Sequence, residues 1–181
     1  MPFSVFKRKP LSAEAARAYD VIVAQARQPY FYLEAGVPDT LDGRFDLIVL
    51  HAFLVMHRSA GNGAEAERFN QALFDIMFKD MEANLRTIGV SDLRVGKKVK
   101  QMAQAFYGRS VAYREALKTD GDDALAEALR RNLYRQSDPS DDQVGVLADY
   151  LRAEVANLAE QPLTAVLGGH PSFGPPGGTS R

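Results

Sequence analysis

The chain has 181 residues, carries 22 Lys and Arg against 23 Asp and Glu, and is 46% hydrophobic. This length fits one compact domain, the composition excludes a wholly disordered chain, and a net charge of -1 argues against a general polyanion binder. The absence of Cys excludes disulfides, thiolate nucleophiles and cysteine-ligated metal centres.

The start of the chain lacks the order of a signal peptide, and no apolar run approaches the roughly 18–20 residues that cross a bilayer. We therefore expect a cytoplasmic protein with a flexible segment at 1–10 and a folded helical domain at 11–165. Phe3 and Phe6 precede the basic residues 7–9, a pattern that could contact an anionic membrane. A frayed N-terminus is the plainer interpretation of the same segment.

Apolar residues recur at spacings of three and four, and no stretch alternates strictly as a half-buried strand does. The predicted fold is therefore all-α, a single-domain bundle of about six helices. The predicted helices run over 12–27, 41–58, the stretch between the turn at 61–63 and Gly89, 92–117, 123–135 and 140–160. Ser12, Asp39 or Thr40, and Ser91 or Asp92 are candidate N-terminal caps for the first, second and fourth.

Two further segments do not follow the helical pattern. Residues 29–40 combine aromatics with prolines and a glycine, so we expect an ordered loop or short helix packed on the bundle. Residues 166–181 are rich in Gly and Pro and are predicted to form a disordered tail.

The predicted helix at 41–58 is apolar on most sides, which indicates a central position. The helix at 92–117 keeps Val95, Val99 and Phe106 on one face for roughly six turns. Gly108 falls inside that helix, where we expect either close packing or a break.

Charge is unevenly distributed along the chain. Residues 92–118 carry seven basic and two acidic groups, whereas residues 119–160 carry four basic and ten acidic groups. If the side of the helix that carries Val95 faces the bundle, four basic side chains on the other side form an exposed ridge. Its members are Arg94, Lys97, Lys98 and Lys100. The ridge is either a solvated face or a contact for a phosphate backbone, an anionic lipid or an acidic peptide.

Arg109 projects close to the buried direction of the same helix, so it must find a carboxylate or carbonyl partner. Asp39, Asp75 and Asp80 are candidate partners. A structural ion pair is favoured over a catalytic arginine. A small-ligand enzyme would require Arg109 and Asp80 to meet in one pocket.

The sequence contains no Gly-rich phosphate loop, nucleophile elbow or zinc-binding His motif. We therefore assign no catalytic, cofactor-binding or metal-binding residue and predict that the protein is not an enzyme. His51 and His57 are interpreted as core or surface residues.

Methionine and phenylalanine are frequent on the predicted helices. The ordinary interpretation of these side chains is a hydrophobic core, and the alternative is a groove that shelters an apolar client, because Met adapts to varied apolar partners. The side chains are Met56, Met77, Met81, Met102, Phe31, Phe69, Phe74, Phe78 and Phe106.

Several motifs follow one another in order between residues 28 and 120. They are GVPDTLDGRF at 36–45, LHAFL at 50–54, FDIMFKDM at 74–81, NLR at 84–86, GVSDLRVGKKVK at 89–100 and AFYGR at 105–109. Together these motifs resemble the ubiquinol-cytochrome c chaperone family. The resemblance implies a mostly helical assembly factor for the cytochrome bc complex. Because the start of the chain does not look like a transit peptide, we expect a bacterial member of the family.

This resemblance implies a binding protein that holds a newly made cytochrome b subunit, or another subunit of the bc complex, near the inner membrane. A ribosome, a partner assembly factor and an anionic membrane surface are further expected contacts, and specific DNA is not. The partner-binding candidates are Asp39, Arg44, Phe45, Arg94, Lys97, Lys98, Lys100 and Arg109. The alternative function is a ribosome- or nucleic-acid-binding module that uses the basic helix at 92–118.

Overall fold

The computed structural model describes residues 11–121 and 123–177, which form eight helices and no strand. The helices are α1 (Ser12–Ala26), α2 (Pro29–Leu33), α3 (Leu41–Ser59), α4 (Gly63–Thr87), α5 (Asp92–Leu117), α6 (Asp123–Asn132), α7 (Asp141–Glu160) and α8 (Leu163–Leu167). The all-α prediction is confirmed. The six long helices match the predicted ones. The five-residue α2 confirms the short helix expected within 29–40, and α8 is additional.

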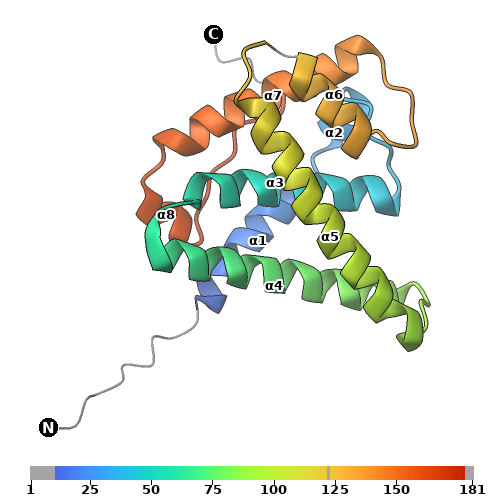
Figure 1. Cartoon of the computed structure of the whole chain (residues 1–181), viewed down its shortest axis with the longest axis vertical. Helices are drawn as coiled ribbons and strands as arrows, with labels where there is room; N and C mark the ends of the chain where they lie inside the picture. The colour runs from blue at the N-terminus through green and yellow to red at the C-terminus, as the bar shows by residue number, and fades with distance from the viewer. Residues whose placement is uncertain (1–10, 122, 178–181) are drawn as a thin grey trace, which may run out of the picture.

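Helix α3 lies at the centre of the bundle and contacts α1, α4, α5, α7 and α8. Figure 1 shows α5 crossing in front of α3, with α4 and α5 converging on the turn at 88–91. Leu47, Leu50 and Leu54 on α3 are almost completely buried. A helix with large apolar side chains on most sides can bury them only when neighbours surround it, so the predicted central position is confirmed.

Local signals explain several helix ends. Thr40 Oγ1 accepts a hydrogen bond from the backbone N–H of Gly43 at 3.1 Å and so caps α3. Ser140 and Gln143 form a capping box at the start of α7. Gly89 lies just after α4 and adopts the left-handed backbone conformation, with a φ of 88°, that commonly ends a helix. Ser12 is the first residue of α1 rather than its cap, because the capping position is held by Leu11.

Helix α5 continues without interruption through Gly108. A Cβ at this position would meet no atom within 4 Å. The predicted break or close packing is therefore wrong, since the glycine lies on an exposed side of the helix.

The end of the described chain is packed against the bundle. Residues 168–177, the C-terminal strap, run back along α7, where the Gln161 side chain bonds both the backbone N–H and C=O of Ser172. Glu154 accepts the N–H of Gly174 at 2.8 Å, and Gln25 on α1 donates to the C=O of Gly174 at 2.9 Å.

The predicted disorder of 166–181 is therefore wrong for residues 166–177. Polar side chains from α1 and α7 satisfy the backbone of the strap, and Phe173 packs edge-on against His51 with ring centroids 5.2 Å apart. Composition alone does not reveal such distant partners. Residues 178–181 and the segment at 1–10, predicted to be flexible, lie outside the described residues.

His51 belongs to a buried polar chain that joins α1, α3 and α7. Its Nδ1 lies 2.8 Å from the C=O of Leu47 and must donate, so Nε2 accepts from the Tyr150 hydroxyl at 2.9 Å. Gln25 Nε2 in turn donates to that hydroxyl. Complete burial lowers the pKa of His51 to about 4. His51 is a satisfied core residue, as interpreted from the sequence.

Candidate partner-binding groove and basic face

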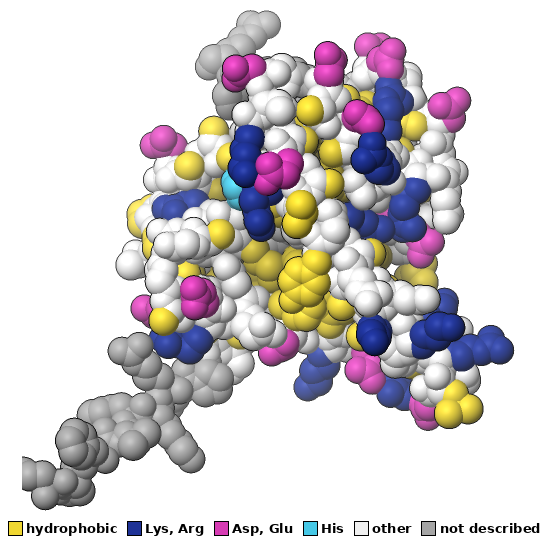
Figure 2. Space-filling model, in the orientation of Figure 1, with side chains coloured by type: hydrophobic (Ala, Val, Ile, Leu, Met, Phe, Trp, Pro, Cys, Tyr) yellow, Lys and Arg dark blue, Asp and Glu magenta, His cyan; other side chains and the backbone are white. Residues whose placement is uncertain are grey.

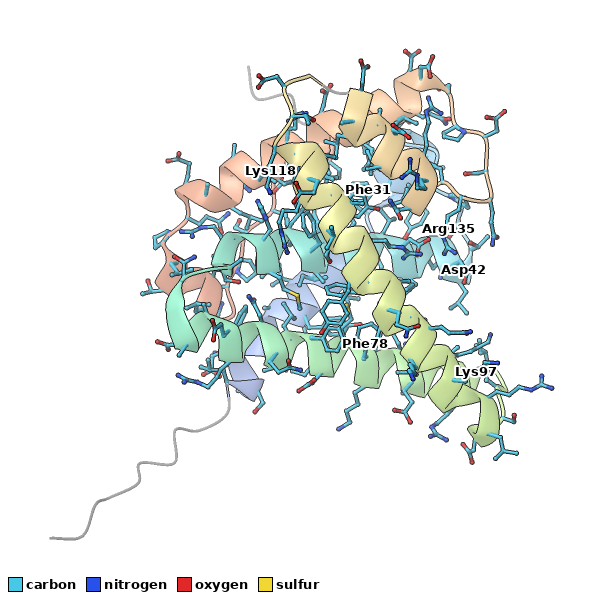
Figure 3. All side chains as sticks on the ribbon, viewed as in Figure 1. Phe31, Asp42, Phe78, Lys97, Lys118 and Arg135 are labelled. Atoms are coloured by element: carbon cyan, nitrogen blue, oxygen red, sulfur yellow. The ribbon has the colours of Figure 1, made fainter. Side chains whose placement is uncertain are left out.

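A groove of about 320 Å³ opens between the first turn of α3, the second half of α4 and the first half of α5. We call it the α3–α5 groove. Its apolar lining residues are Leu41, Phe45, Met81, Leu85, Met102 and Ala105, and its polar lining residues are Asp42, Asn84, Lys98, Gln101, Arg109 and Arg135. In Figure 3, Asp42 and Arg135 mark one end of this region and Lys97 lies toward the other.

The Met and Phe side chains divide between the core and this groove. Phe31, Phe69 and Met77 are completely buried, so the ordinary interpretation as core is confirmed for them. Met81 and Met102 line the groove, although Met81 also belongs to the buried core and Met102 packs against that core. Because thioether side chains adapt to irregular apolar surfaces, this part of the lining suits a partner of variable shape.

A cluster of three charges, of which Asp46 and Arg109 are buried and Arg135 is exposed, closes one end of the groove. Arg109 Nη1 on α5 donates to Asp46 Oδ1 at 2.5 Å, and Arg135 Nη2 donates to the other carboxylate oxygen at 2.8 Å. Asp46 is 3% exposed as a residue. Burial raises the pKa of the Asp46 carboxyl, and both guanidinium groups oppose this rise. Asp42 lines the same end of the groove and interacts electrostatically with Arg135, so two carboxylates balance the two cations.

The prediction that Arg109 needs a carboxylate is confirmed, but the proposed partners were wrong. Asp39 pairs with Arg44, Asp75 is exposed, and Asp80 accepts the Tyr19 hydroxyl at 2.8 Å. The enzyme hypothesis loses its support, because Arg109 and Asp80 do not share a site. One signal could have identified the true partner, since Asp46 is a lone carboxylate within an otherwise apolar stretch of α3.

The basic ridge is exposed, as predicted. Arg94, Lys97, Lys98 and Lys100 are all exposed, and none forms an ion pair with a residue that the structure describes. Figure 2 shows Lys and Arg side chains gathered at the lower right end of the molecule, where α4 meets α5. Only Lys98 of the ridge also lines the α3–α5 groove.

The remaining candidates lie next to the groove. Phe45 is largely buried between the groove and a second hollow, which is lined by Asp39 and Arg44. The Arg44 Nε–Asp39 Oδ1 distance is 2.6 Å, and this hydrogen bond lowers the pKa of Asp39. The structure thus brings Phe45, Lys98 and Arg109 together, and places the other candidates outside that groove.

Within the described part of the chain, no helix combines the length and apolar character needed to cross a bilayer. The same residues contain no cluster of three or more His, Asp or Glu side chains suited to a metal ion.

Comparison with known proteins assigns the family. Residues 33–173 match the family model described as Ubiquinol-cytochrome C chaperone. The chain belongs to the ubiquinol-cytochrome c chaperone family. The matched range contains all eight partner-binding candidates and every residue that lines the α3–α5 groove.

Relatives in this chaperone family include the ubiquinol-cytochrome c reductase complex assembly factor 1 of Mus musculus and of Homo sapiens. They are 26% and 24% identical over 153 residues, which cover 84% of this chain and 52% and 51% of theirs. The chain thus spans about half the length of these relatives. A crystal structure of the Cbp3 homolog from Brucella abortus matches with a TM-score of 0.83 and 36% identity over 93% of each chain.

Proposed function

We propose that this protein is an assembly chaperone that binds newly made cytochrome b during biogenesis of ubiquinol-cytochrome c reductase. The observation that carries the proposal is the family match over residues 33–173, which includes the entire α3–α5 groove. The mammalian relatives are named as assembly factors of the same complex.

The groove would hold the client without making or breaking covalent bonds. A space of about 320 Å³ is at the lower end of the range for ligand pockets, so it suits a few apolar side chains of a longer polypeptide. Each large apolar side chain buried contributes about 1.5–3 kcal/mol before the cost of association. Two such side chains give weak binding, as a chaperone that must release its client requires.

The charged end of the groove would orient the client. The Arg135 side chain is exposed and lines the groove, so its guanidinium group can donate to a carbonyl group of the client. An apolar segment that ends in such a group fits the combined lining of Met81, Met102 and the two arginines.

Site-specific crosslinking in cells tests this function. A photoreactive amino acid in place of Gln101, which lines the groove, should form an adduct with cytochrome b. The same probe in place of Glu67, exposed near the start of α4, serves as the matched control and should not. Equal adducts at both positions would contradict the groove, and adducts with ribosomal proteins alone would favour the ribosome-binding alternative.

A groove-filling variant tests the site independently of crosslinking. Ala105→Phe adds a ring to the lining and should reduce recovery of cytochrome b in a pull-down, with an unchanged circular dichroism spectrum. Ala64→Phe, at an exposed position outside the groove, should not. Normal abundance of the bc complex in cells lacking this protein would contradict the function itself.

A further inference from the structure

A second face of α5 is exposed along the whole helix, although Tyr107 stacks on Phe74 of α4 and Lys118, just after the helix, pairs with Glu115. Residues spaced alternately by four and three along α5 are all exposed, and this spacing keeps them on one side at 3.6 residues per turn. We call this face the outer stripe. Its members are Leu93, Lys97, Lys100, Gln104, Tyr107, Val111, Arg114 and Lys118. Lys97 and Lys118 mark its two ends in Figure 3.

The outer stripe concentrates exposed apolar side chains. Leu93 is 96% exposed, Tyr107 57% and Val111 53%. Of the six large hydrophobic side chains exposed in the described chain, three lie on this stripe, and Ile88 lies in the turn just before α5. Such a concentration on one face marks an interaction surface rather than scattered exposure.

The stripe is also positively charged. It contains four cations and no carboxylate, and Lys97, Lys100 and Arg114 form no ion pair with described residues. The carboxylates beside its N-terminal end, Glu82 and Asp92, are both engaged by Arg86. They therefore do not neutralise the lysines of the stripe.

We propose that the outer stripe lies on the surface of a membrane that contains anionic lipid. Helices that bind in the plane of a membrane combine Lys and Arg with aromatic and aliphatic side chains, and lysines meet the headgroups while apolar groups enter the acyl boundary. Helix α5 has 26 residues and so presents about 39 Å of such a face. The inference rests on α5 alone and does not depend on the proposed client.

Other partners fit the stripe less well. A partner helix would require apolar residues at nearly every position of a seam, whereas Lys97, Lys100 and Gln104 interrupt it. Nucleic acid would account for the cations and for Tyr107, but it offers no apolar environment for Leu93.

The absence of Trp from the chain permits a direct test, because one introduced Trp reports its own environment. Leu93→Trp and Val111→Trp in the full chain should show a blue-shifted emission, and quenching by brominated lipid, with vesicles of phosphatidylcholine and phosphatidylglycerol. Pure phosphatidylcholine should give a much smaller response. Leu33→Trp, at an exposed position on α2, is the control and should respond to neither.

Charge variants measure the electrostatic part of binding by vesicle co-sedimentation. Lys97→Gln with Lys100→Gln should weaken binding to the anionic vesicles by roughly 25-fold, because each cation near the surface contributes about five-fold. Arg68→Gln with Lys79→Gln removes the same charge from exposed positions of α4 and should change binding less than about two-fold.

Three results would overturn the proposal. The first is the absence of binding to anionic vesicles, and the second is an equal loss in the stripe and control variants. The third is tight binding of polyuridylic acid, unaffected by Leu93→Ala, without any Trp response to lipid. That last result would assign the stripe to nucleic acid.

Discussion

Asp46 is expected to be the most sensitive charged residue of the bundle. Asp46→Ala removes the carboxylate that two guanidinium groups share, and the Arg109 side chain, only 8% exposed, then lies buried without a counterion. Removing one partner of a buried ion pair costs about 3–5 kcal/mol, because the remaining charge cannot regain its hydration. We expect a loss of that size in the free energy of unfolding, measured by urea titration.

Two further variants separate this mechanism from a simple loss of contacts. Arg135→Ala should cost less than about 1 kcal/mol, because its side chain is 37% exposed and water screens its charge. Asp46→Leu combined with Arg109→Met replaces the buried pair by apolar groups and should recover most of the stability. The reasoning is refuted if Asp46→Ala costs less than about 1 kcal/mol, or if the double variant is no more stable than Asp46→Ala.

Three other predictions concern the core and the strap. Because the folded pKa of His51, about 4, lies below its ordinary value of 6.5, the free energy of unfolding should fall as the pH drops between these values. In urea titrations of the unaltered protein, the free energy of unfolding should fall by about 3 kcal/mol, and the fall should be absent from His51→Gln. The same pH dependence in both proteins would contradict this. Gly43→Ala places a Cβ in collision with the backbone oxygen of Pro38 and should cost about 1–3 kcal/mol in thermal unfolding. Gly108→Ala, in open space, should stabilise α5 slightly, and equal effects of the two substitutions would refute the distinction. Phe173→Ala should cost about 2 kcal/mol and speed amide exchange in residues 168–177, since its ring is half-buried against His51; unchanged exchange would show that the ring does not hold the strap.

Periodicity predicted the helices because each one buries a stripe of its own sequence. Leu47, Leu50 and Leu54 follow this rule on α3, as do Leu125 and Leu129 on α6. The turn at Gly89 also depends on local sequence, because the backbone there adopts the left-handed conformation that glycine favours. These features depend on residues a few positions apart, which a single sequence contains in full.

Features that depend on distant residues could not be predicted in this way. Arg109 and Asp46 are 63 positions apart, so their pairing depends on how α5 crosses α3. The sequence predicted Lys97 and Lys100 of the outer stripe as exposed cations but did not reveal its apolar members, because hydrophobic periodicity reports the buried line of α5 instead. Of the candidate site, the sequence predicted exposed cations, a buried arginine and, as one alternative for the Met and Phe side chains, an apolar groove, but not which residues line that groove.

The C-terminal strap also constrains the order in which the protein can be completed. Residues 168–177 are made after α1, α3 and α7, so a nascent chain halted before the strap lacks the Phe173 ring that packs against His51. Burial is what lowers the pKa of His51, and the imidazole of such a chain is less buried. The halted chain should therefore show a smaller lowering of the His51 pKa than the finished protein.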